Sequence, residues 1–466
     1  MSILSTLFIG REALATHQQA IQTTGHNLAN VNTPGFSRQR VELSSAVPEI
    51  QGNLSLGHGV HSDGIRGLVS DFFETQLLNV NGTLGFSQAE NRALAGVEGA
   101  FPTTGGLPSA LDNFFSALSD LASNPGGQAE RVNLIGKANA LGETLGHVRN
   151  TIANVQTGLD KDLAVSVQRV NDVLPQVANL NKQIVAGEVG GDRANDLRDQ
   201  RQVLLQELSR LTGATVQEES DGQATVHVHG LLLVSRDQAA TLDATTVNAA
   251  GLRSISYQSP NGIRADATTL ITNGEIGGLI ATRDSEVPRV LNTLDQLAKT
   301  LVDTVNTQHA VGFDLDGNPG GNFFAPIATT TGAAAQVQVA SAVVTDPRLI
   351  ATAQTAAGAP GDNRNALALT NLQHTVQAAL GNTTLNTYLQ SLIGDVGTKA
   401  QASETGVDFQ NALLKESQAR REATSGVSID EEMTNLILFQ RAFQAASVLV
   451  RTGDEMYQTI LDMVRP

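Results

Sequence analysis

Residues 428–461 read SIDEEMTNLILFQRAFQAASVLVRTGDEMYQTIL, which is the clearest periodic pattern in the chain. Apolar side chains recur at alternating steps of four and three residues, the repeat of a helix that packs along a narrow seam. The predicted seam residues are Ile429, Met433, Leu436, Phe443, Val450, Tyr457 and Leu461. Ser428 and Glu431 have the spacing of a capping box and predict the start of the helix. Such a helix is on the order of 50 Å long and needs a partner helix to cover its seam.

The amino-terminal segment offers that partner. A complementary apolar stripe recurs there at every seventh residue, at Leu7, Leu14, Ile21 and Leu28. We therefore expect the N- and C-terminal helices to pair as an α-helical coiled coil. A lone two-helix coil is marginal in water, so the two seams also predict that many copies pack side by side. A coiled-coil stalk or dimerisation arm is the alternative that the same pattern allows.

A stiff turn follows the amino-terminal stripe, in the stretch NLANVNTPGFSRQ (27–39). Proline presets φ for the second position of a turn, and glycine tolerates the positive φ of the third position in a type II turn. We expect this turn to end the helix and to redirect the chain at a fixed angle. Its residues join the seam residues as the predicted assembly interface: Asn30, Asn32, Pro34, Gly35 and Phe36.

The interior of the chain contains long helical patterns interrupted by one β-rich stretch. Apolar spacing predicts one long helix over about 128–186, with Pro175 as the expected kink, and a second helix over about 195–211. A third helix is expected around 287–305. Between the second and third helices the sequence alternates and is β-branched. Its turn signals are Asp221-Gly222, Asn261-Gly262 and Asn273-Gly274.

These patterns predict a mainly α fold with an inserted β-rich domain and discontinuous domains. Residues 1–50 and 425–466 are expected to form a terminal coiled-coil domain that lines an inner tube. Residues 51–213 and 283–424 are expected to form a long-helix bundle, with an irregular or strand patch at about 325–360. Residues 214–282 are expected to form the β-rich domain, which faces outward.

Composition narrows the class of protein further. The 466 residues carry a formal net charge of -16 with no long basic block, which argues against nucleic-acid and anionic-membrane binding. The absence of cysteine excludes disulfides and thiolate sites. No apolar run approaches the roughly 18 residues of a membrane span, and the amino terminus is a poor secretory signal. A cytoplasmic protein and a protein exported without a cleaved signal both fit.

The sequence contains few residues in a spacing that could support catalysis or metal binding. His227 and His229 would share one face of a strand and could share a metal, but no third ligand can be named. Residues 314–318 (DLDGN) begin like a calcium loop, but Ala325 stands where a bidentate glutamate should be, so we expect a polar turn. The charged residues of 193–201 are expected to form an ion-pair network on a solvated face. We therefore predict no catalytic, cofactor-binding or metal-binding residues, no cofactor and no enzyme activity.

The two ends together resemble a signature shared by the axial proteins of the bacterial flagellum, which are its rod, hook and hook-associated proteins. The amino-terminal helix with NLANVNTPGFSRQ carries one half, and SGVSIDEEMTNLILFQRAFQAASVLVRTGDEMYQTIL (425–461) carries the other. Interior stretches such as ANDLRDQRQVLLQELSRLTGATVQ (194–217) and GDNRNALALTNLQ (361–373) are similar to the hook-associated family of the hook-filament junction. Rod and hook proteins share the ends but lack these interior segments.

The resemblance implies a structural protein that self-associates into a helical ring between hook and filament and is needed for filament assembly. Implied partners are the flagellar hook protein, the third hook-associated protein and an export chaperone that binds the C-terminal helix, with no nucleic acid and no membrane insertion. It also implies secretion through the flagellar export apparatus without a cleaved signal peptide, to an extracellular place on the flagellum. A flagellar hook or rod protein, or a secreted coiled-coil adhesin, is the alternative.

Overall fold

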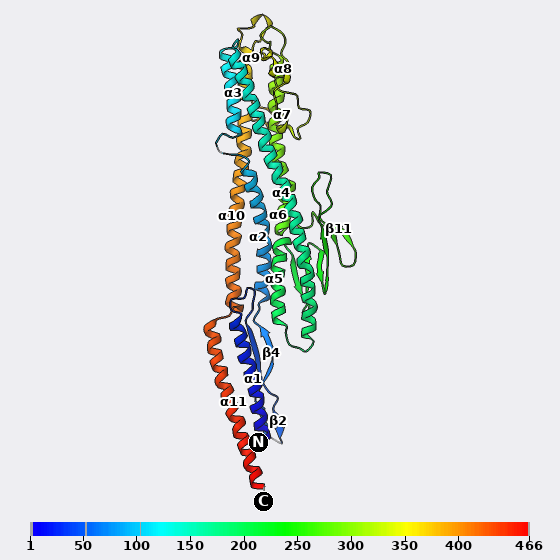
Figure 1. Ribbon diagram of the computed structural model, residues 1–466, viewed down its shortest axis with the longest axis vertical. Helices are drawn as coiled ribbons and strands as arrows, with labels where there is room; N and C mark the ends of the chain where they lie inside the picture. Colours follow the sequence, from blue (N-terminus) through cyan, green and yellow to red (C-terminus); the bar gives the residue numbers. More distant parts are fainter. Residues whose placement is uncertain (1–2, 52–53, 103, 465–466) are drawn as a thin grey trace.

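The computed structural model describes residues 3–51, 54–102 and 104–464, and these form an elongated rod of long helices (Figure 1). Both ends of the described chain lie at the same end of the rod. The helices are α1 Ile3–Ala29, α2 Asp71–Glu98, α3 Leu107–Ser123, α4 Gln128–Glu188, α5 Asn195–Thr212, α6 Gly274–Ala281, α7 Val287–Ala310, α8 Ser341–Thr345, α9 Arg364–Asn371, α10 Leu385–Ser425 and α11 Ile429–Val464. The mainly helical prediction is thus confirmed.

Small antiparallel sheets account for the strands. These are β1 Gln39–Ser45, β2 Glu49–Gln51, β3 Leu54–Leu56, β4 Val60–Gly67, β5 Thr215–Glu218, β6 Ala224–Val228, β7 Leu231–Ser235, β8 Gln238–Ala239, β9 Thr241–Asp243, β10 Ser256–Gln258 and β11 Arg264–Asp266. β1 pairs with β4, and β2 pairs with β3. The inserted unit contains two sheets, in the orders β5-β6-β7-β8 and β11-β10-β9. It projects sideways from the rod beside α4 and α5 (Figure 1).

The terminal helices α1 and α11 lie side by side at one end of the rod and run antiparallel (Figure 1). Small residues let the two backbones approach closely. A Cβ on Gly10 would lie 2.5 Å from Val450 Cγ2, and a Cβ on Gly453 would lie 2.9 Å from Leu7 Cδ2. The predicted pairing of the two ends is therefore present within a single copy.

The long-helix bundle forms the middle of the rod and its far tip. α4 is continuous through Pro175, and α5 ends at Gly213, whose φ of 68° is the left-handed conformation expected of a glycine after a helix. The buried core is chiefly aliphatic. The tip adds an aromatic cluster that the low aromatic content had not suggested, made of Phe114, Phe115, Phe323 and Phe324.

The β-rich insertion is shorter than predicted. Its last strand ends at Asp266, and residues 274–286 form α6 and a π turn that leads into α7. Asn273-Gly274 is therefore the start of a helix and not a strand turn. Gly274 has a φ of 70° and lies against the end of α5, where a Cβ would be 2.5 Å from the Thr212 nitrogen. The other two predicted turns are confirmed, since Gly222 and Gly262 have φ near 84° and 83° between paired strands.

The segment 325–360 is irregular, which is one of the two expected alternatives. It contains short helical turns and two isolated bridges, Phe324 to Val339 and Phe313 to Ala353, and its described residues form no extended strand. Its alanines pack directly on α4, where a Cβ on Gly142 would lie 2.2 Å from the Val337 oxygen. One further expectation was wrong: residues 54–56 and 60–67, expected in the helix bundle, form β3 and β4, which pair with β2 and β1.

Candidate assembly interface

The turn after α1 has the predicted type II geometry. The Phe36 amide donates to the Thr33 oxygen at 3.2 Å, and Gly35 has a φ of 80°. A Cβ on Gly35 would lie 2.4 Å from Val203 Cγ2, so the turn sits directly on α5. Glycine at the third position is therefore required by its positive φ and by close packing, and proline at the second position presets φ for the turn.

The turn does not end the helix, however. α1 ends at Ala29, where the backbone amide and the side chain of Asn30 both donate to the His26 oxygen, at 3.1 and 3.0 Å. Asn30 thus closes the last turn of the helix, whereas Asn32 and Pro34 are exposed on the surface. The type II turn acts after the helix is finished, and it sets the direction in which the chain continues.

Hydrogen bonds and ion pairs hold the turn against the bundle. The Ser37 amide donates to Asp199 Oδ2 at 2.7 Å, which ties the turn to α5. Arg421 of α10 donates to the Gly35 oxygen at 2.9 Å and pairs with Glu74 of α2 at 2.5 Å. One arginine therefore connects three elements at the joint between the terminal helices and the bundle.

A second polar cluster holds α11 against the same joint. Asn27 exchanges two hydrogen bonds with the backbone of Gln39, at 2.8 and 2.9 Å, and donates a third to Glu432 at 3.0 Å. Arg38 pairs with Glu432 at 2.7 Å and with Glu431 at 2.6 Å. Sequence reasoning missed Asn27, Arg38 and Glu432, although the first two lie in the quoted motif. The Glu431 side chain binds Arg38 and does not reach back toward Ser428. Of the predicted capping box, only the bond from the Glu431 amide to Ser428 Oγ is present, at 3.5 Å.

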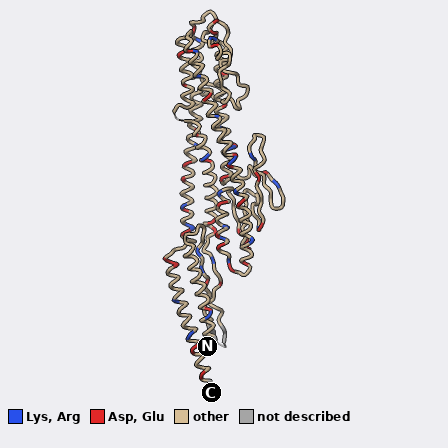
Figure 2. The backbone as a smooth tube through the Cα atoms, viewed as in Figure 1, with Lys and Arg blue, Asp and Glu red and all other residues tan. Residues whose placement is uncertain are grey.

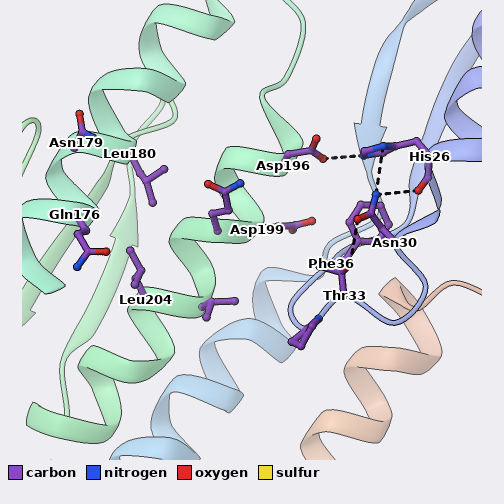
Figure 3. A pocket seen from close by; sticks show the side chains of 13 residues that line it. His26, Asn30, Thr33, Phe36, Gln176, Asn179, Leu180, Asp196, Asp199 and Leu204 are labelled. Carbon is purple, nitrogen blue, oxygen red and sulfur yellow. Dashed lines mark hydrogen bonds and ion pairs between the residues drawn. The ribbon is translucent and has the colours of Figure 1, made fainter. Parts of the chain in front are cut away.

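A cavity of ≈ 540 Å³ lies between the turn and the helices α4 and α5 (Figure 3). His26 reaches across it to Asp196 at 3.2 Å. The remaining lining residues are Asn30, Thr33, Pro34, Phe36, Gln176, Asn179, Leu180, Asp199, Gln200, Val203 and Leu204. Charged and amide groups therefore surround a small apolar floor, and the joint is only partly filled in a single copy.

Burial raises the pKa of Asp199 to about 6, against the opposing effect of the hydrogen bond from the Ser37 amide. A carboxyl whose pKa is raised on folding favours the protonated folded state. The resulting stabilisation is complete below the unfolded pKa of about 4 and is lost as the pH rises through about 6.

Asp199→Asn should therefore stabilise the protein at pH 7.5 by about 1–2 kcal/mol and have little effect at pH 4. The asparagine oxygen can still accept from the Ser37 amide. Urea unfolding of both proteins at matched pH values between 4 and 7.5 measures this difference and cancels the titration of other groups. A difference in stability that does not change with pH would contradict the assignment.

The charged residues at the start of α5 form the predicted ion-pair network, but it is not wholly solvated. Arg198 pairs with Glu188 at 2.7 Å, near the end of α4. Arg201 is buried and donates to Asn181 Oδ1, to the Gly222 oxygen and to Glu218. Its guanidinium therefore ties α4 and α5 to the inserted sheet, which corrects the expectation of a surface network.

The predicted seam on α11 meets α1 in part only. Leu436, Phe443 and Val450 are half-buried, whereas Ile429, Met433, Tyr457 and Leu461 are 42–52% exposed. The companion row that faces α1 is Glu432, Phe439, Ala446 and Gly453, one position earlier than the predicted row. The fully buried positions of α1 are small or polar as well, and the stripe of Leu7, Leu14, Ile21 and Leu28 is half-buried beside them.

This shift has a physical reason. Small residues in both rows, such as Gly10 on α1 and Ala446 and Gly453 on α11, bring the helix backbones close together, which leaves the larger side chains of the predicted seam at the margins of the contact. The sequence pattern identified the larger side chains and therefore placed the seam slightly off the true line of contact.

The other sites considered from the sequence carry no metal-binding arrangement. His227 lies in β6, but His229 has a φ of 43° in the turn before β7, so the two do not share a strand face. Within the described residues no cluster of three or more acidic or histidine side chains could hold a metal ion. Asp314 closes its own polar turn by accepting from the amides of Asp316 and Asn318. No described helix is both long and apolar enough to cross a bilayer.

Comparison with known proteins places the chain among flagellar structural proteins. Residues 7–36 match the flagella basal body rod protein family, and residues 420–463 match the C-terminal domain of the flagellar basal body rod FlgEFG proteins. These are α1 with its turn and the end of α10 with α11. Residues 95–324 match the helical domain of the flagellar hook-associated protein FlgK. The chain is therefore an axial structural protein of the flagellum, as the resemblance of its two ends predicted.

Within that class, the chain is a homologue of flagellar hook-associated protein 1. It is 29% identical to the protein of that name from Bacillus subtilis (strain 168), over 98% of this chain and 99% of the relative. It is 26% identical to the one from Salmonella typhimurium, over 96% of this chain and 97% of the relative. The solved structure of the flagellar hook junction protein FlgK from Burkholderia pseudomallei aligns with a TM-score of 0.66, at 17% identity, over 75% of this chain and 100% of that one.

Proposed function

We propose that this protein forms the junction between the flagellar hook and the filament, and that filament assembly requires it. Each subunit joins a helical ring, with α1 and α11 as a coiled coil that lines the inner tube and the β-rich unit facing outward. The names of the homologues and the match to the FlgK helical domain support this place in the flagellum. The structural character of these relatives also speaks against catalysis.

The observation that carries the proposal is the exposed apolar surface of α11. Large apolar side chains recur on the solvent side along its whole length, each at least 38% exposed: Ile429, Met433, Ile437, Leu438, Val448, Leu449, Met456, Tyr457, Ile460, Leu461 and Met463. So many exposed large apolar side chains on one helix mark an interaction site. Neighbouring copies of the terminal pair would bury it, which explains the need for assembly.

Several finer features follow as parts of the proposal. The terminal helices with the β1–β4 and β2–β3 ribbons, the long-helix bundle, and the β5–β11 unit serve as the terminal, bundle and outer domains. The predicted interface residues, from Leu7 to Phe36 and from Ile429 to Leu461, contact neighbouring subunits. The hook protein and the third hook-associated protein adjoin the ring, and an export chaperone binds α11 before secretion. The chain leaves through the flagellar export apparatus without a cleaved signal and resides outside the cell.

Deletion of the coding region tests the function directly. Cells should keep hooks, lack filaments and release flagellin into the medium. Filaments of normal number and length would refute the junction role. Hooks that carry the protein along their whole length, and not at the tip, would instead favour the alternative of a hook or rod protein.

Ile437→Asp tests the apolar surface without disturbing the subunit, because Ile437 is 49% exposed in a single copy. An unpaired carboxylate buried between copies costs several kcal/mol, so swimming motility in the complemented deletion strain should fall at least about tenfold. Circular dichroism of the purified variant should be unchanged. Phe409→Asp, at a 63% exposed position on α10, is the matched control and should retain motility. Normal filaments on the Ile437→Asp strain would exclude this face from the contact.

A further inference from the structure

The chain contains three asparagine-glycine pairs, at residues 81–82, 261–262 and 273–274. In such a pair the backbone nitrogen of the glycine can attack the side-chain carbonyl carbon of the asparagine, because glycine has no Cβ to shield that nitrogen. Closing this five-membered ring requires the backbone to leave its folded conformation and the glycine amide to give up its hydrogen bond. The folded structure therefore decides which of the three pairs can react.

The Asn81–Gly82 pair is held inside α2. Asn81 Nδ2 donates to the Leu77 oxygen at 2.8 Å. Gly82 is buried, and a Cβ there would lie 3.2 Å from Gly213 Cα at the end of α5. Ring closure would have to break helical hydrogen bonds against a packed neighbour. The pair can therefore react only when the middle of the rod opens.

The Asn273–Gly274 pair is held at the same crossing. Asn273 precedes α6, and its backbone oxygen accepts from the Gly277 amide at 3.2 Å. A Cβ on Gly274 would lie 2.5 Å from the Thr212 nitrogen, so this backbone has no room to rotate. Asn273 Cβ itself would lie 2.6 Å from a Cβ on Gly213. Reaction at this pair also requires large-scale opening of the fold, which is rare in a stable domain.

The Asn261–Gly262 pair lies in open solvent. It is in the turn between β10 and β11, and β11 lies on the side of the inserted unit that faces away from the rod (Figure 1). Both residues are exposed, and a Cβ on Gly262 would meet nothing within 4 Å. The Asn261 side chain makes no hydrogen bond among the described residues. The Gly262 amide donates to the Ser259 oxygen at 2.9 Å, and a hydrogen bond in an exposed turn opens far more readily than a packed helix.

We propose that Asn261 is a site of spontaneous deamidation. The Gly262 nitrogen loses its proton to water and bonds to Asn261 Cγ. The bond from Cγ to Nδ2 breaks, and Nδ2 takes up a proton and leaves as ammonia. Water then opens the cyclic imide at either carbonyl carbon, which gives aspartate or isoaspartate. Nothing is oxidised or reduced, and water is the only co-reactant. The inference does not depend on the assembly proposed above.

Deamidation changes the outer unit and leaves the rod intact. Each event adds one negative charge to a surface where basic and acidic positions are interspersed (Figure 2). Isoaspartate also adds a methylene group to the main chain. It should therefore break the bonds that close the turn, from the Ser259 amide to the Ile263 oxygen at 2.8 Å and from the Ile263 amide to Ser259 Oγ at 3.0 Å. Ile255 and Ala267 are buried farther along the hairpin and should keep their own bond.

Mass spectrometry of tryptic peptides tests the site. Cleavage after arginine places the three pairs in separate peptides, 67–92, 254–264 and 265–283. The purified protein is incubated at mildly alkaline pH and sampled over days. Peptide 254–264 should gain one mass unit, in two products that separate by chromatography, at least about tenfold faster than either other peptide. In urea-unfolded protein the three peptides should react at similar rates.

Asn261→Ser is the matched control, because it removes the side-chain amide from an exposed position. It should abolish the mass gain in peptide 254–264 and leave the circular dichroism unchanged. Equal rates for the three peptides in the native protein would show that the fold does not select the site. Reaction of peptide 254–264 in urea alone would show that the turn protects Asn261. Either result would overturn the proposal, whereas the deletion strain tests the role in the flagellum separately.

Discussion

Methionine in place of Arg131 should lower the stability of the tip of the rod by about 3–5 kcal/mol. Arg131 lies near the start of α4, and its side chain is fully buried. Its guanidinium donates to the oxygens of Pro125 and Ile350 at 2.6 and 2.7 Å, with longer bonds to Pro347 and Thr352. Methionine would leave the buried Ile350 oxygen and the Pro125 oxygen without this donor.

The electrostatic setting makes this arginine unusual. Its hydrogen bonds go to oxygens of the backbone and of a threonine, and no carboxylate forms an ion pair with it among the described residues. Burial lowers its pKa to about 10, with the charge of Asp314 acting in the opposite direction. The Arg131 guanidinium is still protonated at neutral pH. The segment 311–362 is therefore organised around a buried positive charge.

Hydrogen exchange is the suitable measurement for Arg131→Met, since the effect should be local to residues 311–362. Amides in that segment should exchange faster by two to three orders of magnitude, while α1 and α11 should not change. Arg131→Lys should show an intermediate loss, because an ammonium group cannot reach all the acceptors of a guanidinium fork. Unchanged protection in Arg131→Met would show that the loop is held by its apolar contacts alone.

Alanine at Gly85 should destabilise the middle of the rod by about 3 kcal/mol, since it forces an atom into closely packed backbone. Gly85 lies on α2 where it crosses α5 and α6, and a Cβ there would be 2.1 Å from the Arg210 oxygen. The facing helix is equally tight, because a Cβ on Gly278 would be 2.5 Å from the Phe86 oxygen. Neither backbone can move aside without disturbing the other.

Gly136→Ala is the matched control, because Gly136 lies inside α4 with nothing within 4 Å of its Cβ position. The same substitution there should stabilise by about 0.5–1 kcal/mol, through the higher helix propensity of alanine. Thermal unfolding followed by circular dichroism should shift in opposite directions for the two variants. Equal shifts in the unfolding temperature would mean that the helix propensity of alanine outweighs the steric clash at Gly85.

Long periodic segments were predicted well because their physical cause is local. The spacing of apolar residues over 128–186 gave nearly the observed bounds of α4, Gln128–Glu188. The turn at Thr33 to Phe36 was predicted down to its type, since proline and glycine restrict φ by themselves. Neither result depends on the rest of the fold.

The errors arose where tertiary contacts decide. The short apolar stretch of α6 contains three glycines and reads poorly as a helix, yet Gly278 packs against α2 and Gly274 against the end of α5. The ribbon of β1 and β4 was missed because its partners are separated by a loop and pair across a bulge at Glu42. At the assembly interface, no pattern in the sequence indicated that Asn27 and Arg38 would meet Glu432, since 405 and 394 positions separate these partners.

The return of the chain to its starting end has a practical consequence. In each subunit the chain runs from the terminal pair to the tip of the rod and back, so both chain ends lie where copies are proposed to join (Figure 1). The tip and the sideways sheets lie away from that end. They can change in length between species without moving the end that assembles. A fluorescent tag or epitope therefore belongs in the hairpin around Gly262, where a side chain meets open space, and not on either extremity.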